Sequence, residues 1–110
     1  MKRVMKKLQT EKTEIDEIVA VDLKDVNYID LWHRTKNSNS KLAYHTTKGS
    51  FQDIDTLADA AEAYQDKGFV MIGRTALVQE SKIDTIASIE NNGSLITFKD
   101  GTQLYVLKQV

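Results

Sequence analysis

Arg74 and Thr75 have the clearest capacity for recognition chemistry in this chain. They stand between two apolar runs, residues 69–72 and 76–78. A guanidinium can donate two parallel hydrogen bonds to the acceptor edge of guanine or to a phosphate. We expect this arginine to be exposed. The alternative is a solvated arginine in a surface salt bridge.

A second group of polar side chains lies between residues 33 and 41, in a stretch without an acidic residue. Lysines there can contact phosphates as point charges, and asparagines can bond to an adenine edge or to a phosphate. Small polar residues also favour turns, so loop formation is the alternative for residues 37–40. The candidates in this segment are His33, Arg34, Lys36, Asn37, Asn39, Ser40 and Lys41.

The residues expected of an enzyme or a metal protein are missing. The absence of cysteine excludes disulfides, thiolate zinc sites and a cysteine nucleophile. The two histidines, His33 and His45, do not belong to a metal-binding motif, and the sequence has no nucleophile elbow and no glycine-rich phosphate loop. We therefore expect a non-enzymatic protein with no metal and no cofactor.

Composition is that of one ordinary globular domain: 110 residues, 41% hydrophobic and 28% charged, with a formal net charge of −1. The charge is segregated along the chain. Residues 14–30 carry six acids and one lysine, whereas residues 33–48 carry four lysines or arginines and no acid. A basic face can therefore form despite the acidic total, and ordinary solvated faces are the alternative. The sequence contains no signal peptide and no apolar run long enough to cross a bilayer, and we expect a cytoplasmic protein.

The hydrophobic pattern predicts strands over residues 15–23, 26–32, 41–46 and 50–54, then a helix over 56–66. Asp55 or Thr56 is the expected N-cap of this helix. Its expected buried face consists of Leu57, Ala60, Ala61 and Tyr64. Further strands are predicted over 84–90, 94–99 and 102–108, separated by turns at residues 92–93 and 100–101, where Asn-Gly and Asp-Gly are typical hairpin turns.

Residues 1–12 are predicted to be a basic amphipathic N-terminal segment preceding a domain over residues 13–110. Met1, Val4, Met5 and Leu8 have helical spacing, but an extra strand or a flexible arm are alternatives. The predicted fold is mostly β (α+β), with several small antiparallel sheets and one short helix.

This order of elements resembles the LytTR family of DNA-binding domains. Three motifs carry the resemblance: Val26-Asn27-Tyr28-Ile29-Asp30 in a strand, Thr56-Leu57 opening the helix, and residues 71–79 after Phe69. The chain departs from the family pattern at five positions, where a histidine, a serine, an aromatic residue, an asparagine and a terminal arginine are replaced by Gly73, Thr75, Ala76, Gln79 and Lys108.

The resemblance implies a bacterial transcription regulator that binds double-stranded DNA through loops. By position, the family's three contact regions correspond to the segment from His33 to Lys41, to Arg74 with Thr75, and to Lys108 near the C-terminus. Family sites are often direct repeats, so two copies per site, or a homodimer, are expected. Family members often carry a receiver domain upstream, for which these 110 residues leave no room. We therefore expect either a regulator that acts without this input or a fragment of a longer protein. The rival hypothesis is a degenerate LytTR-like module that binds a protein partner.

Overall fold

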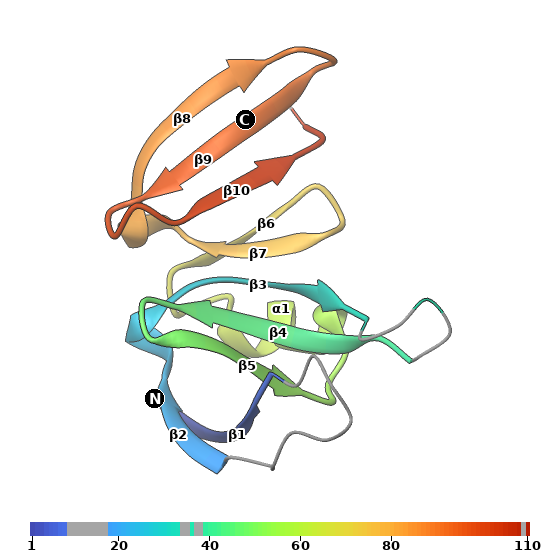
Figure 1. Cartoon of the computed structure of the whole chain (residues 1–110), viewed down its shortest axis with the longest axis vertical. Helices are drawn as coiled ribbons and strands as arrows, with labels where there is room; N and C mark the ends of the chain where they lie inside the picture. The colour runs from blue at the N-terminus through green and yellow to red at the C-terminus, as the bar shows by residue number, and fades with distance from the viewer. Residues whose placement is uncertain (9–17, 34–35, 37–38, 109) are drawn as a thin grey trace.

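The computed structural model describes residues 1–8, 18–33, 36, 39–108 and 110, and in them it contains two antiparallel sheets and one α-helix (Figure 1). The predicted mostly-β fold with one short helix is confirmed. The elements in chain order are β1 (Lys2–Lys7), β2 (Ile18–Asp22), the 3₁₀ turn η1 (Leu23–Asp25), β3 (Val26–Trp32), β4 (Lys41–Thr46), β5 (Gly49–Asp53), α1 (Leu57–Tyr64), β6 (Phe69–Ile72), β7 (Ala76–Gln79), the 3₁₀ turn η2 (Glu80–Lys82), β8 (Ile83–Ile89), β9 (Gly93–Phe98) and β10 (Gln103–Val106).

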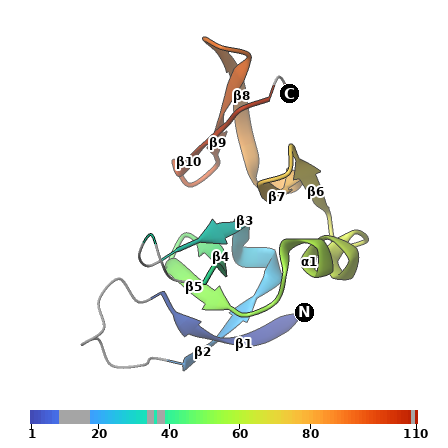
Figure 2. The same ribbon diagram turned by 90° about the vertical axis from the view of Figure 1, so that its right-hand side faces the viewer.

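The larger sheet has seven strands in the order β2-β1-β5-β4-β3-β7-β6. Helix α1 covers one face of it, beside β3, β6 and β7 (Figure 2). Thr56 caps the helix by accepting a hydrogen bond from the Asp59 amide (3.1 Å), as one of the two expected caps. The expected helix face is confirmed, since Leu57, Ala60 and Tyr64 are buried and Ala61 packs against the same core.

The N-terminal segment forms strand β1, which pairs with both β2 and β5. A helix over these residues is therefore wrong, and the alternative of an extra strand is confirmed. A short isolated helix is marginal in water, whereas a strand between two others gains hydrogen bonds on both sides. Arg3 links β1 to the segment before the helix and to the last residue of the helix, because its guanidinium contacts Asp53 (2.8 Å), Asp55 (2.9 Å) and the Tyr64 hydroxyl (3.1 Å).

The smaller sheet has the strand order β10-β9-β8. The two sheets follow one another along the longest axis of the molecule, with the smaller sheet at the top of Figure 1. A second core fills the space between the sheets. In it the Tyr28 ring of β3 stacks on the Phe98 ring of β9, with centroids 5.5 Å apart. This core also contains Ile72, Ala76, Val78, Ile96 and Val106. The position of the smaller sheet therefore depends on side chains from β3, β6 and β7.

The β8–β9 turn is one residue earlier than its sequence suggests. Asn91 and Asn92 are the residues with positive φ (64° and 61°), so the predicted turn at residues 92–93 is corrected to 91–92. Gly93 instead begins β9, and a Cβ there would lie 2.7 Å from the Tyr105 ring. A side chain at this position would therefore have to displace the outer end of the Tyr105 ring, which belongs to the neighbouring strand β10. In the 100–101 turn, by contrast, Gly101 has a φ of +90°, as its sequence predicts.

Asp100 links the two sheets through hydrogen bonds. Its Oδ2 accepts from the Thr47 hydroxyl (2.6 Å) and from Asn27 Nδ2 (2.8 Å), and Asn27 is 3% exposed. These bonds, first that of Thr47, hold the pKa of Asp100 well below its usual value. The ionised carboxylate therefore stabilises the folded state above pH 4, and this contribution is lost as the pH falls through the depressed folded-state pKa.

We expect Asp100→Asn to lower the free energy of unfolding by roughly 1 kcal/mol at pH 7, because an amide offers fewer acceptor sites to these donors. The difference from wild type should shrink as the pH falls from about 5 to 2, because the carboxylate binds its proton in the unfolded chain while it is still ionised in the folded one. Urea unfolding followed by circular dichroism at several pH values measures it. A difference that stays constant over this range would show that the charge of Asp100 is not responsible.

Candidate nucleic-acid interface

The three predicted contact regions lie at one end of the strands. In the β3–β7 ladder Tyr28 pairs with Val78 and Asp30 with Ala76, so the same register leads from Trp32 toward the turn that holds Arg74. On the other side of β3, Trp32 pairs with Lys41. The right-hand side of Figure 1 shows the result, with the end of β3 and the start of β4, the β6–β7 turn and the end of β10 placed one above another.

The lowest region is the connection between β3 and β4. Lys36, Asn39 and Ser40 are exposed there, while Lys41 is half-buried as the first residue of β4. His33 is exposed directly after β3. Arg34 and Asn37, which were predicted as contacts, lie outside the described residues. The described part of this connection thus offers one flexible cation, one amide and one hydroxyl to solvent.

The central region is the turn Gly73-Arg74-Thr75 between β6 and β7. All three residues are exposed. Gly73 has a φ of +61°, a conformation that glycine adopts without strain. Within the part of the chain that the structure describes, Arg74 forms no ion pair. The salt-bridged alternative for this arginine therefore finds no partner among those residues.

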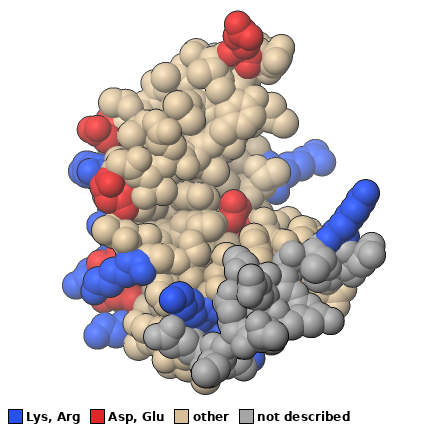
Figure 3. Space-filling view, viewed as in Figure 1, with Lys and Arg blue, Asp and Glu red and all other residues tan. Residues whose placement is uncertain are grey.

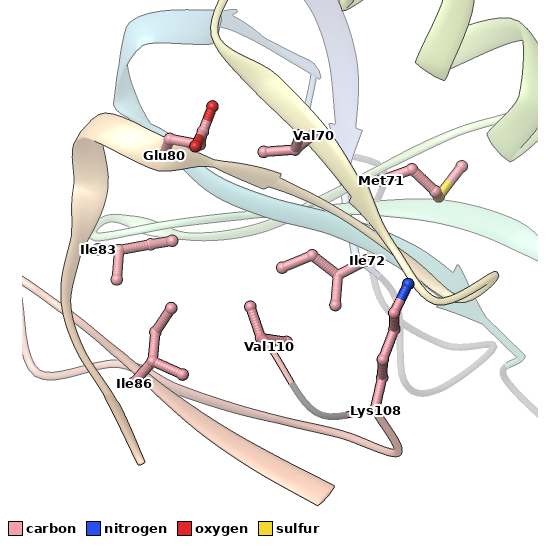
Figure 4. Close-up of a pocket in the computed structure, with 8 residues that line it drawn as sticks. All are labelled: Val70, Met71, Ile72, Glu80, Ile83, Ile86, Lys108 and Val110. Carbon is pink, nitrogen blue, oxygen red and sulfur yellow. The ribbon is translucent and has the colours of Figure 1, made fainter. Parts of the chain in front are cut away.

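The upper region is the chain after β10, where Lys108 is exposed. Ser94 of β9 holds this segment in place, because its hydroxyl donates to the Lys108 carbonyl (2.6 Å) and accepts from the Val110 amide (3.1 Å). Lys108 then borders a pocket of about 260 Å³ that Met71 and Ile72 of β6 also line. Figure 4 shows its ammonium group next to the end of β6, so the upper region reaches the central turn.

Basic groups project from this edge of the molecule. In Figure 3 the blue side chains at the right-hand edge have no red neighbours beside them, whereas blue and red alternate along the left-hand edge. Four described cations belong to the three regions: Lys36, Lys41, Arg74 and Lys108. Lys36 and Lys41 come from the acid-free segment 33–48, and with Arg74 and Lys108 they form a basic edge on a domain of net charge −1.

A hydrogen-bonded array across β3, β4 and β5 lies on the face that carries Tyr28. His45 contacts Asp30 Oδ1 through Nε2 (2.8 Å) and Ser50 Oγ through Nδ1 (2.7 Å), and its ring stacks on Tyr28 at 4.3 Å. Burial, and then the nearby Asp30 carboxylate, raise the pKa of Tyr28 to about 12, so the phenol stays neutral. Both ring nitrogens of His45 are hydrogen-bonded within the array, which supports a structural role for this histidine.

The described residues contain no helix that is long and apolar enough to span a membrane. They also contain no group of three or more histidine or acidic side chains that could hold a metal ion.

Comparison with known proteins identifies the family. The model of the LytTr DNA-binding domain matches residues 16–109, which is most of the chain. This protein belongs to the LytTr family. A solved LytTr DNA-binding domain from Bacillus cereus has the same fold, with a TM-score of 0.72 and 13% sequence identity, over 98% of this chain and 86% of that one. No curated protein matches the sequence.

Membership of a DNA-binding family supports DNA binding by this LytTr domain, and the family is not one of enzymes. Strand β1 precedes the matched residues, yet it lies inside the seven-stranded sheet. Residue types made these segments candidates for recognition, but they gave no sign that Trp32 is level with the Arg74 turn. That neighbourhood depends on the β3–β7 register, a pairing between distant segments for which the sequence carries no local signal.

Proposed function

We propose that this LytTr domain is a sequence-specific, double-stranded DNA-binding transcription regulator of the bacterial cytoplasm, and that it reads DNA with loops. The observation that supports it most is the alignment of three polar, cation-bearing segments along one edge. Arg74 and Thr75 contact base edges or phosphates from the central turn. The flanking segments supply phosphate contacts from Lys36, Lys41 and Lys108 and amide or hydroxyl contacts from Asn39 and Ser40, with His33, Arg34 and Asn37 in the same connection.

The departures from the family pattern agree with retained DNA binding. Ala76 is 1% exposed in the core between the sheets, and Gln79 is buried with its amide nitrogen donating to the Val26 carbonyl (2.6 Å). These two positions therefore affect packing, not the surface that faces DNA. Gly73 permits the positive φ of the turn, and Lys108 keeps a positive charge where the family has arginine. The rival hypothesis, a module that binds a protein partner, requires that this edge has lost the side chains that recognise DNA.

The salt dependence of binding tests this proposal. If the four described cations each neutralise one phosphate, the plot of log K against log salt has a slope of roughly −3.6, from about −0.9 per contact. Fluorescence anisotropy with a labelled duplex between 50 and 300 mM salt gives the slope. The matched control is Lys48→Ala, which removes an exposed charge from the opposite end of the strands, in the β4–β5 turn, and should leave the slope unchanged.

Lys108→Ala should make the slope less negative by about 0.9, the contribution of one phosphate contact. It should weaken binding to all duplexes to a similar extent. A slope near zero for the wild-type protein would contradict the proposal and favour the protein-partner reading. We also expect two copies to bind each site, on direct repeats, which the stoichiometry of the same titration measures.

A further inference from the structure

Trp32, the last residue of β3, is a half-buried aromatic side chain outside both hydrophobic cores. It belongs neither to the core that α1 covers nor to the core between the sheets, whereas Tyr28 of the same strand is part of the second. Among the described residues the Trp32 indole makes no ring contact and no hydrogen bond. Tryptophan is enriched at interfaces because its large apolar ring can be covered there while its N–H group still finds a partner.

The side chain of Trp32 points to the face of the larger sheet on which the upper contact region lies. Side chains alternate along a strand, so Trp32 shares the face of Tyr28. The smaller sheet packs over that face through the stacking of Tyr28 on Phe98, and Lys108 follows its last strand. Leu31, which is 46% exposed, points to the opposite face, where α1 lies. Trp32 is thus turned toward the upper contact region and Leu31 away from it.

Trp32 also lies beside two cations of the basic edge. On β4 it pairs with Lys41. The β3–β7 register, in which Asp30 pairs with Ala76, brings Trp32 level with Arg74 when it is extended by two residues. Opposed residues of antiparallel strands have Cα atoms about 4.5–5.5 Å apart, and neighbouring bases of one DNA strand are about 3.4 Å apart. A duplex that meets Arg74 at one base pair therefore meets Trp32 at the next.

The base edges in the major groove of DNA carry one apolar group, the C5-methyl group of thymine. We propose, as an extension of the proposed DNA binding on which it rests, that Trp32 contacts this methyl group in the base pair next to the one that Arg74 contacts. Trp32 then determines specificity through an apolar contact, whereas Arg74 and the lysines act through charge and hydrogen bonds.

Replacement of thymine by deoxyuridine tests the contact, because it removes the methyl group and keeps base pairing. The probe is a duplex that the wild-type protein enriches from a random pool, with each thymine replaced in turn. Replacement at one position should weaken wild-type binding about fourfold, the effect of one buried methyl group. Trp32→Ala should weaken binding to the thymine duplex about five- to tenfold, because roughly 50 Å² of apolar surface is no longer buried. The same replacement should then have no further effect on this variant.

Salt dependence and fluorescence separate this contact from the charged ones. Trp32→Ala should keep the wild-type slope of log K against log salt, because it removes no cation, whereas Lys108→Ala changes the slope. Leu31→Ala is the matched control at the same end of β3, and it should keep both the affinity and the deoxyuridine effect. Trp32 is the only tryptophan, so in the wild-type protein its emission should shift to shorter wavelengths as the duplex binds. This last measurement needs no variant to fold.

The outcomes distinguish this inference from the DNA binding on which it rests. If the wild-type protein binds the duplex but no thymine replacement weakens binding, or if the effect persists in Trp32→Ala, the contact with thymine is wrong and DNA binding stands. Unchanged Trp32 emission on a bound duplex would also overturn the contact. A folded wild-type protein that binds no duplex would refute the proposed function and this inference with it.

Discussion

Arg74→Ala is expected to weaken binding to the preferred duplex by about 1–3 kcal/mol, or roughly 5- to 150-fold in Kd. The guanidinium stands at the centre of the basic edge, exposed in a turn and without an ion pair among the described residues. Its loss removes up to two charge-assisted hydrogen bonds and one cation. If Arg74 reads a base, the variant also loses discrimination at one position of the site, which competition with single-base variants of the duplex measures.

Arg74→Lys separates charge from geometry in this experiment. Lysine keeps the cation but not the planar fork, so it should restore the salt dependence and not the base discrimination. The free energy of unfolding should stay within about 0.5 kcal/mol of wild type for both variants, since the side chain is exposed. Unchanged affinity of Arg74→Ala for the preferred duplex would remove Arg74 from the contact surface.

Phe98→Ala is expected to lower the free energy of unfolding by about 3–5 kcal/mol. Phe98 is 1% exposed and stacks on Tyr28, so its removal leaves a cavity between the two sheets. The same core sets the position of the smaller sheet, and with it the distance from Lys108 to the Arg74 turn. Urea unfolding followed by tryptophan fluorescence and circular dichroism measures the loss, with Phe98→Leu as a control that keeps most of the volume.

If the two sheets separate, Phe98→Ala should weaken DNA binding more than Lys108→Ala does, because the whole segment after β10 is then displaced from the Arg74 turn. Assays at low temperature and with confirmed folded protein keep this effect apart from unfolding. A cost below about 1 kcal/mol for Phe98→Ala would show that the smaller sheet does not depend on this stacking, contrary to the packing described above.

Local signals in the sequence were sufficient for most elements. The helix was evident from the spacing of Leu57, Ala60 and Tyr64 and from its Thr56 cap, and the turn at Gly101 from its composition. The N-terminal segment was ambiguous because Met5 and its neighbours fit two periods. Only the pairing of β1 with β2 and β5, which joins distant residues, decides in favour of a strand.

The candidate interface could be predicted by segment but not by arrangement. Residue types identified Arg74 and the basic connection after Trp32, because arginine and lysine between apolar runs are exposed. Their proximity follows from strand order β4-β3-β7-β6, in which a strand formed after the helix pairs with one formed before it. The contact of Gly93 with the Tyr105 ring has no local signal for a similar reason, since that ring belongs to another strand.

The most direct test of the central claim is selection of duplexes from a random pool by the purified, folded protein. We expect enrichment of a recurring motif, arranged as a spaced direct repeat, and loss of that enrichment for Arg74→Ala, whereas Lys48→Ala should retain it. A pool that stays random after several rounds at low salt, with the protein shown to be folded by circular dichroism, would contradict sequence-specific DNA binding by this LytTr domain.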